Sequence, residues 1–191
     1  PPPPLRKGGS RTRTDPSVRA ARKENTVNPS AKFSDLIEAL EFDSPMHIMY
    51  FDRQTGRVVS VDRDVMNGVE EGDEEKLRGL PDWQKDEVEI ARAVCDDNGE
   101  RFIDAPDKFD FHEYHHMECF IETLEDKEAA DGLWRAIKGK GAFRRFKDTA
   151  DGLGLLDRWF RYRDEAKKEV VIAWAEANNV PFEDDLAGPT P

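Results

Sequence analysis

The spacing of apolar residues changes along the chain, and each change marks a different predicted element. From Phe33 to Leu40 the apolar positions recur every three or four residues, which predicts a short helix. Segments 47–51 and 57–61 are rich in β-branched and aromatic residues, and Gly56 between them suits the turn of a β-hairpin. The first part of the folded chain is therefore predicted to be a helix followed by a hairpin.

The segment after the hairpin is predicted to contain a loop, a helix and a strand. Glycines and acidic residues crowd residues 67–81, which predicts the loop. A helix is expected to begin near Trp83 and to end before Gly99, because apolar residues again follow the helical spacing. Residues 101–104 have the composition of a third strand, which Pro106 would end.

The second half of the chain is predicted to be helical, with glycines and acidic residues separating the helices. These helices cover about 111–124, 126–138, 142–153 and 155–179. The last one carries an apolar stripe that includes Trp159, Ala173 and Trp174, and we expect its tryptophans to be core residues. We therefore predict an α+β fold: a short N-terminal helix and a small antiparallel sheet of about three strands, followed by a four-helix C-terminal region.

Composition sets the expected domain limits. The 191 residues include 37% apolar and 9% aromatic residues, enough for one domain with a core. Residues 1–32 are rich in Pro, Arg, Ser and Gly, which predicts a disordered basic tail. Their Arg-rich, acid-poor composition also resembles an organelle transit peptide, although a plain linker suits it better. We expect a single α+β domain over 33–186 and a disordered C-terminus over 187–191.

Hydropathy and cysteine content narrow the expected cellular setting. The chain lacks any run of about 18 apolar residues, so neither a membrane span nor a membrane partner is expected. Its two cysteines, Cys95 and Cys119, form no Cys-x-x-Cys pair, which argues against a disulfide scaffold and a cysteine-only zinc site. A reducing compartment fits this usage, and we expect a soluble, cytoplasmic protein unless the tail directs import into an organelle.

The net charge of −12 is distributed unevenly along the chain. Residues 1–32 hold eight basic and two acidic residues, a net charge of +6. Residues 133–168 hold eleven basic and five acidic residues, again +6, so the rest of the chain carries −24. A protein this acidic is a poor non-specific binder of nucleic acid, but a local positive field can still attract an anionic partner to one face.

The most unusual stretch is 139–148, where two glycines and several basic residues open a predicted helix. A turn formed by Gly139 and Gly141 would leave backbone N–H groups free at the positive helix end, as in a phosphate cradle. However, the spacing fits neither the nucleotide P-loop nor the dinucleotide fingerprint. The alternative is a tight turn between helices, in which Phe143 and Phe146 pack inward. This second interpretation is favoured, because basic runs on helix faces are usually only solvated.

Arg163 falls on the apolar stripe of the last predicted helix rather than on its polar side. A guanidinium in this position needs an acidic partner, for which Asp148 and Asp164 are the candidates. We expect a structural ion pair rather than an active-site arginine, because buried arginines are rarely unpaired.

A second cluster with chemical potential is rich in histidine. On a helix His112, His115, His116 and Cys119 would share one face, directed away from the core. They are weak candidates for zinc or nickel ligands, since one helix cannot surround a tetrahedral ion and the His-Glu-x-x-His order is missing. We therefore assign no metal, cofactor or catalytic residue.

Residues 139–148 and their surroundings resemble the signature of uncharacterised protein family number 0158 of the UPF series. The resemblance extends to the Asp52–Gly56 loop and to Met117, Phe120, Ile121, Leu133, Trp159, Arg163, Asp164, Ala173 and Trp174. It implies a shared fold and a shared set of positions, without catalytic residues to carry over. The histidine cluster is not among these positions.

We expect a non-catalytic binding or regulatory module that contacts an anionic protein partner through a basic helical surface. The predicted contacts are Lys138, Lys140, Arg144, Arg145, Lys147 and Arg158. Further structural or functional candidates are Gly139, Gly141, Phe143, Phe146, Asp148, Trp159 and Arg163. The first alternative is nucleic-acid binding through the same surface. The second, less favoured, is a metal-dependent enzyme that uses the histidine cluster.

Overall fold

The computed structural model of the protein describes residues 29–186. In chain order its elements are β1 (Ala31–Lys32), α1 (Phe33–Glu41), β2 (His47–Asp52), β3 (Arg57–Asp62), α2 (Arg63–Glu71), α3 (Glu74–Arg78), η1 (Asp82–Gln84), α4 (Lys85–Asp96), β4 (Phe102–Asp104), α5 (Glu113–Glu122), α6 (Lys127–Ala136), α7 (Ala142–Gly152), α8 (Leu156–Ala177) and β5 (Phe182–Glu183). None of the helices in this range has the length and apolarity needed to cross a bilayer. The predicted C-terminal tail and most of the predicted N-terminal tail lie outside the described residues.

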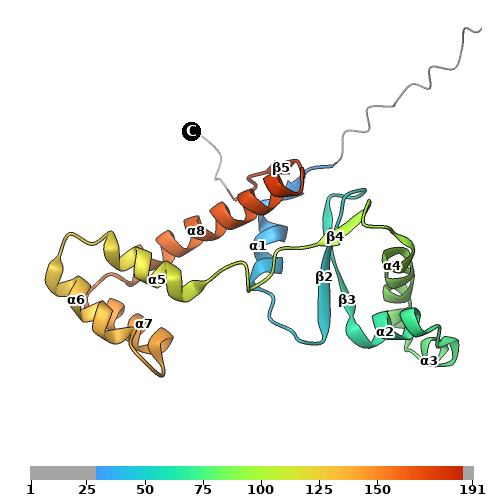
Figure 1. The fold of residues 1–191 in the computed structure, drawn as a ribbon, viewed down its shortest axis with the longest axis horizontal. Coiled ribbons are helices and arrows are strands. Elements are labelled where there is room, and N and C mark those ends of the chain that lie inside the picture. The colour runs from blue at the N-terminus through green and yellow to red at the C-terminus, as the bar shows by residue number, and fades with distance from the viewer. Residues whose placement is uncertain (1–28, 187–191) are drawn as a thin grey trace, which may run out of the picture.

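The main sheet is antiparallel, with the strand order β3-β2-β4. Phe51 pairs with Val58 on one side and with Ile103 on the other, so these three side chains share one face. That face packs against α1 and the C-terminal half of α8, whereas α2, α3 and α4 cover the opposite face (Figure 1). The predicted α+β class with a three-stranded antiparallel sheet is confirmed.

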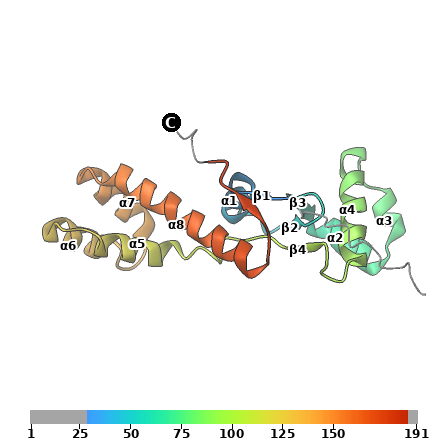
Figure 2. The same ribbon diagram turned by 90° about the horizontal axis from the view of Figure 1, so that it is seen from above.

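Two regions share the long helix α8. The helical lobe comprises residues 113–162, and the sheet body comprises residues 31–104 and 166–183 (Figure 2). Trp159 is buried in the core of the lobe, while Val171 and Ala175 are buried in the core of the body. Ala173, predicted to lie on the buried stripe, is exposed, because the second core meets α8 at a different angle from the first.

The prediction of a loop over 67–81 is wrong, because two short helices occupy most of this segment. The carboxylates of Asp62 and Asp73 accept hydrogen bonds from backbone N–H groups and cap the starts of α2 and α3. Gly72 ends α2 at a positive φ of 69°. Gly72, Asp73 and Gly79, which suggested a loop, are therefore helix caps, whereas the other acidic residues of the segment lie mostly within the two helices.

The predicted tail also ends earlier than expected. Ala31 and Lys32 form β1, which pairs in parallel with β5. Ala31 is buried in the core of the sheet body, and its N–H donates to the carbonyl of Pro181 at 2.8 Å. Residues before 33 thus belong to the fold, and β1 and β5 meet beside α8.

Candidate functional site

The basic turn, defined as residues 138–147, joins α6 to α7 at one end of the helical lobe. Gly139 and Gly141 have φ values of 80° and 74°, which favour glycine and let the chain reverse direction within a few residues. Among the described residues no side chain caps the start of α7, whose N-cap residue is Gly141. The turn projects Lys138, Lys140, Arg144 and Lys147 into solvent.

Arg145 belongs to this turn but points back into it. Its guanidinium donates to the carbonyl of Ala136, the last residue of α6, at 3.1 Å and to those of Lys138 and Lys140 in the turn that follows. These carbonyls have no partner within the helix, so a cation placed there satisfies them and opposes the negative end of the helix dipole. Arg145 therefore fills the space inside the turn, which supports its interpretation as an interhelical connection rather than a phosphate cradle.

Arg158 has a similar role at the end of α5. Its guanidinium donates to the carbonyl of Thr123 at 3.1 Å. Two of the six predicted partner contacts are therefore engaged with backbone carbonyls. Of the other four, Arg144 lies 3.7 Å from Asp148 in a solvent-exposed pair, and no lysine of the turn has an ion pair within residues 29–186.

The two phenylalanines of the turn have different environments. Phe146 is fully buried, and its ring lies 4.8 Å from that of Trp159 and 6.1 Å from that of Phe120. Phe143 is 47% exposed, so the prediction that both rings pack inward is wrong for this residue. Ala142, also in the first turn of α7, is buried in the same hydrophobic cluster as Phe146, so Phe143 lies on the side of the turn that faces solvent.

The histidine cluster is divided between two environments. His116 is half-buried and stacks on Phe111 with 4.3 Å between ring centroids, and burial lowers its pKa, helped by the charge of His115. His115 lies 3.5 Å from the Cys119 sulfur on the exposed side, and His112 immediately precedes α5. Among residues 29–186, no three His, Cys, Asp or Glu side chains are placed to hold a metal ion.

Arg163 lies where the lobe meets the body, and of its two predicted acidic partners only Asp164 lies near it. Glu41 at the end of α1 and Glu113 at the start of α5 lie 3.7 and 3.8 Å from its guanidinium, whereas Asp164 is 4.0 Å away and Asp148 pairs with Arg144 instead. One turn further along α8, Lys167 is 5% exposed and donates a hydrogen bond to Glu41. Sequence reasoning missed Glu41, Glu113 and Lys167.

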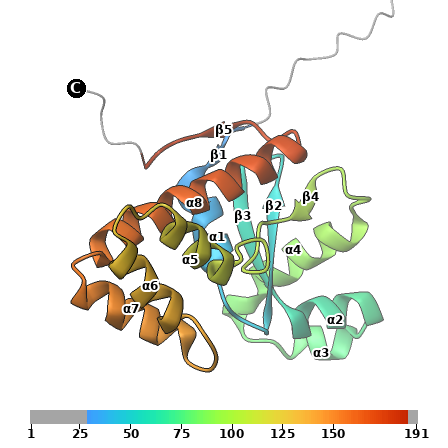
Figure 3. The same ribbon diagram turned by 60° about the vertical axis from the view of Figure 1, so that its left-hand side comes forward.

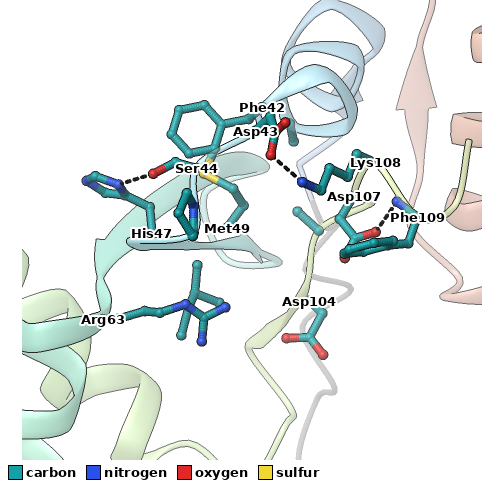
Figure 4. A pocket seen from close by; sticks show the side chains of 14 residues that line it. Phe42, Asp43, Ser44, His47, Met49, Arg63, Asp104, Asp107, Lys108 and Phe109 are labelled. Carbon is teal, nitrogen blue, oxygen red and sulfur yellow. Dashed lines mark hydrogen bonds and ion pairs between the residues drawn. The ribbon is translucent and has the colours of Figure 1, made fainter. Parts of the chain in front are cut away.

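These charged groups line the junction cleft, a hollow of about 500 Å³ bounded by α1, α5 and α8. A second hollow of about 410 Å³ adjoins it, lined by the start of β2 and by the segment after β4. Figure 4 displays this neighbour: Lys108 points toward Asp43, with which it pairs, and the two residues line both hollows. On its far side Ser44 Oγ and His47 Nδ1 lie 3.0 Å apart.

A model of the uncharacterised protein family UPF0158 matches residues 30–190. The chain belongs to this family. No curated protein and no solved structure matches it. The match covers most of the chain but assigns no activity, so the function has to be argued from the residues of the site.

In this UPF0158 protein, the Asp52–Gly56 loop is built around a buried carboxylate. Asp52 is 2% exposed and accepts two hydrogen bonds of 2.8 Å from Arg101, with further bonds from Thr55 and the N–H of Gln54. Burial by itself raises the pKa of Asp52, but these hydrogen bonds and the charge of Arg101 outweigh burial and hold the pKa below its usual value. The Asp52–Arg101 pair thus has a structural role and ties the hairpin to the start of β4.

Proposed function

We propose that this UPF0158 protein is a non-catalytic binding module whose basic turn contacts an anionic partner, with single-stranded nucleic acid as the favoured class. The proposal rests mainly on the exposed ring of Phe143, which lies among the solvated side chains of Lys140, Arg144 and Lys147. Basic side chains attract the phosphate backbone, while an exposed aromatic ring provides a face on which a base can stack. An acidic protein partner would use the charges but has no need for the ring.

The contacts of the six predicted basic residues divide them into two groups. Arg145 and Arg158 cap helix ends, so we assign them to folding. Lys138, Lys140, Arg144 and Lys147 remain for the partner. Four phosphate contacts on a single strand correspond to a slope of about −3 when log K is plotted against log salt concentration.

Fluorescence anisotropy with labelled single- and double-stranded DNA and RNA, over about 50 to 200 mM salt, tests the proposal. Arg144→Glu/Lys147→Glu is expected to weaken binding by at least about 10-fold and to reduce the salt slope by about half. The matched control Arg57→Glu/Lys127→Glu makes the same charge change at two exposed positions away from the turn and is expected to keep most of the affinity. Equal losses in both variants would contradict a role for the turn.

Phe143→Ala separates the two classes of partner. On single strands it is expected to cost about 1–3 kcal/mol of binding free energy, while binding to duplexes changes little because their bases are already stacked. If no nucleic acid binds even at low salt, the favoured class is wrong. Polyglutamate as the probe, with the same pair of charge variants, then tests the acidic-protein alternative.

A further inference from the structure

The junction cleft lies between parts of the chain that are far apart in sequence. Glu41 closes α1, Phe111 and Glu113 lie at the start of α5, and Arg163 and Lys167 extend from the middle of α8. Figure 3 shows α1, α5 and α8 converging at this place, beside the sheet. The cleft is separate from the basic turn, which lies at the α6–α7 end of the lobe.

Arg163 brings a rigid set of donors into this cleft without using them. Its three acidic neighbours are 3.7 to 4.0 Å away, beyond hydrogen-bond distance, and Arg163 makes no hydrogen bond to any part of the chain that the structure describes. Its side chain is only 23% exposed, and its Nε is buried without an acceptor. Buried polar groups are normally hydrogen-bonded, so this guanidinium has capacity for a ligand.

The acidic side of the cleft has spare capacity as well. Glu113 is 33% exposed on its side chain and accepts no hydrogen bond from residues 29–186. Glu41 presents one carboxylate oxygen to both Lys167 and Arg163, and its second oxygen has no hydrogen-bond or ion-pair partner within residues 29–186. The cleft therefore offers unused donors and unused acceptors within one space.

The charges of the cleft indicate which ligand class fits it. A simple anion would be attracted by Arg163 and Lys167 but repelled by Glu41 and Glu113, and a simple cation would meet the reverse. A ligand that carries both signs meets a partner for each. Asp43 and Lys108, which pair with each other, also line the cleft. The apolar part of the wall is formed by Leu40 and by Phe111, whose ring stacks on His116 and lies 5.8 Å from the Lys167 ammonium.

We propose that the junction cleft binds a free α-amino acid. The carboxylate of the ligand accepts paired hydrogen bonds from the Arg163 guanidinium, whose planar fork matches it. The ammonium group of the ligand donates to Glu113 and Glu41, and an apolar side chain lies over Leu40 and Phe111. A volume of about 500 Å³ is within the range of small-molecule sites.

Titration calorimetry of the full chain with each of the common amino acids tests this site. We expect at least one amino acid with an apolar side chain to bind with a Kd below about 1 mM. Its N-acetyl derivative, which lacks the ammonium group, and its amide, which lacks the carboxylate, are expected to bind at least about 10-fold more weakly. A dipeptide with the same first residue shows whether the site accepts the end of a peptide instead of a free amino acid, which would overturn the assignment to free ligand.

Substitutions assign the binding to the cleft. Arg163→Gln and Glu113→Gln are each expected to weaken binding by at least about 10-fold, because each removes one half of the paired recognition. Arg161→Gln, an exposed arginine on the same helix, is the matched control and keeps the affinity. Circular dichroism establishes that each variant is folded, and Glu113→Gln provides the test if Arg163→Gln is not. Absence of binding to the unmodified protein at about 10 mM ligand, or binding that both cleft variants retain, overturns the proposal.

Discussion

The helical lobe and the sheet body reach their stability by different routes. The core of the lobe is aromatic, with the rings of Phe120, Phe146 and Trp159 in edge-to-face contact, and all three come from one continuous stretch of the chain. The body joins segments from both ends of the described chain, and its cores are mostly aliphatic, with Phe33 and Phe51 buried among the aliphatic side chains. Local helix pairs thus suffice for the lobe, whereas the body depends on contacts between distant residues.

Both regions use charged side chains to satisfy backbone groups at helix ends: Asp126 caps the start of α6 in the lobe, and Arg53 donates to the carbonyl of Asn178 at the end of α8 in the body. In the lobe, Arg145 and Arg158 donate to carbonyls at the C-terminal ends of helices. In the body, Asp62 and Asp73 accept from N–H groups at the starts of helices, and Asp52 fixes a hairpin. Some basic residues of 133–168 and some acidic residues elsewhere therefore satisfy backbone groups, and only the remaining charges are available to partners.

The largest predicted effect tests whether the lobe can open without the body. Phe146→Ala is expected to cost about 3–5 kcal/mol, because it leaves a cavity among packed aromatic rings. Since the lobe has its own hydrophobic cluster, hydrogen exchange should accelerate in α6 and α7 while β2 and β3 keep their protection. The control Phe143→Ala, at an exposed ring, should change stability by less than about 0.5 kcal/mol. Equal loss of protection in both regions would mean that the shared helix makes them a single cooperative unit.

A smaller effect is expected from breaking the Asp52–Arg101 pair in the sheet body. Asp52→Asn removes the charge that pairs with Arg101 and should cost about 2–3 kcal/mol at pH 7, somewhat less than the roughly 3–5 kcal/mol typical of breaking a fully buried pair, because Arg101 is 40% exposed. Urea unfolding of both proteins at neutral and acidic pH measures this cost.

The difference in stability between the unmodified protein and Asp52→Asn should depend on pH in a definite direction. The pKa of Asp52 in the folded protein lies below 3.8, so its contribution is complete above that pH and is lost as the pH falls through the folded value. The stability gap between the unmodified protein and Asp52→Asn should therefore narrow below about pH 3.8. A gap that stays constant across this window would show that the ionised carboxylate is not the stabilising form.

The smallest effect compares neighbouring arginines of the basic turn. Arg145→Ala should lower stability by about 1–2 kcal/mol, because the carbonyls at the end of α6 lose charged donors. Arg144→Ala should change stability by less than about 0.5 kcal/mol, since its pair with Asp148 is exposed and 3.7 Å long. Thermal unfolding of the two variants side by side measures both. A larger loss from Arg144→Ala would reverse the roles assigned to them.

The basic residues of the junction cleft could be located from sequence, but the acidic residues that they contact could not. Arg163 is detectable because it interrupts an apolar stripe, and Lys167 carries the same signal one turn later. Nothing local marks Glu41 or Glu113 as their neighbours, because the pairing depends on how α1 and α5 pack against α8. Phe143 and Phe146 lie three residues apart, a spacing that predicts the same helix face for both. Only packing distinguishes the exposed ring of Phe143 from the buried ring of Phe146.

Periodicity and turn residues are enough to define the α+β class, the hairpin around Gly56 and the four C-terminal helices, since each depends on contacts within a few residues. The positions of the charged residues along the sequence also show where charge accumulates. Packing between distant segments decides the rest: β1 joins β5, α8 passes from one core to another, and Arg145 turns inward. The junction cleft belongs to this second group, because its charges come from three helices that meet only in the folded chain.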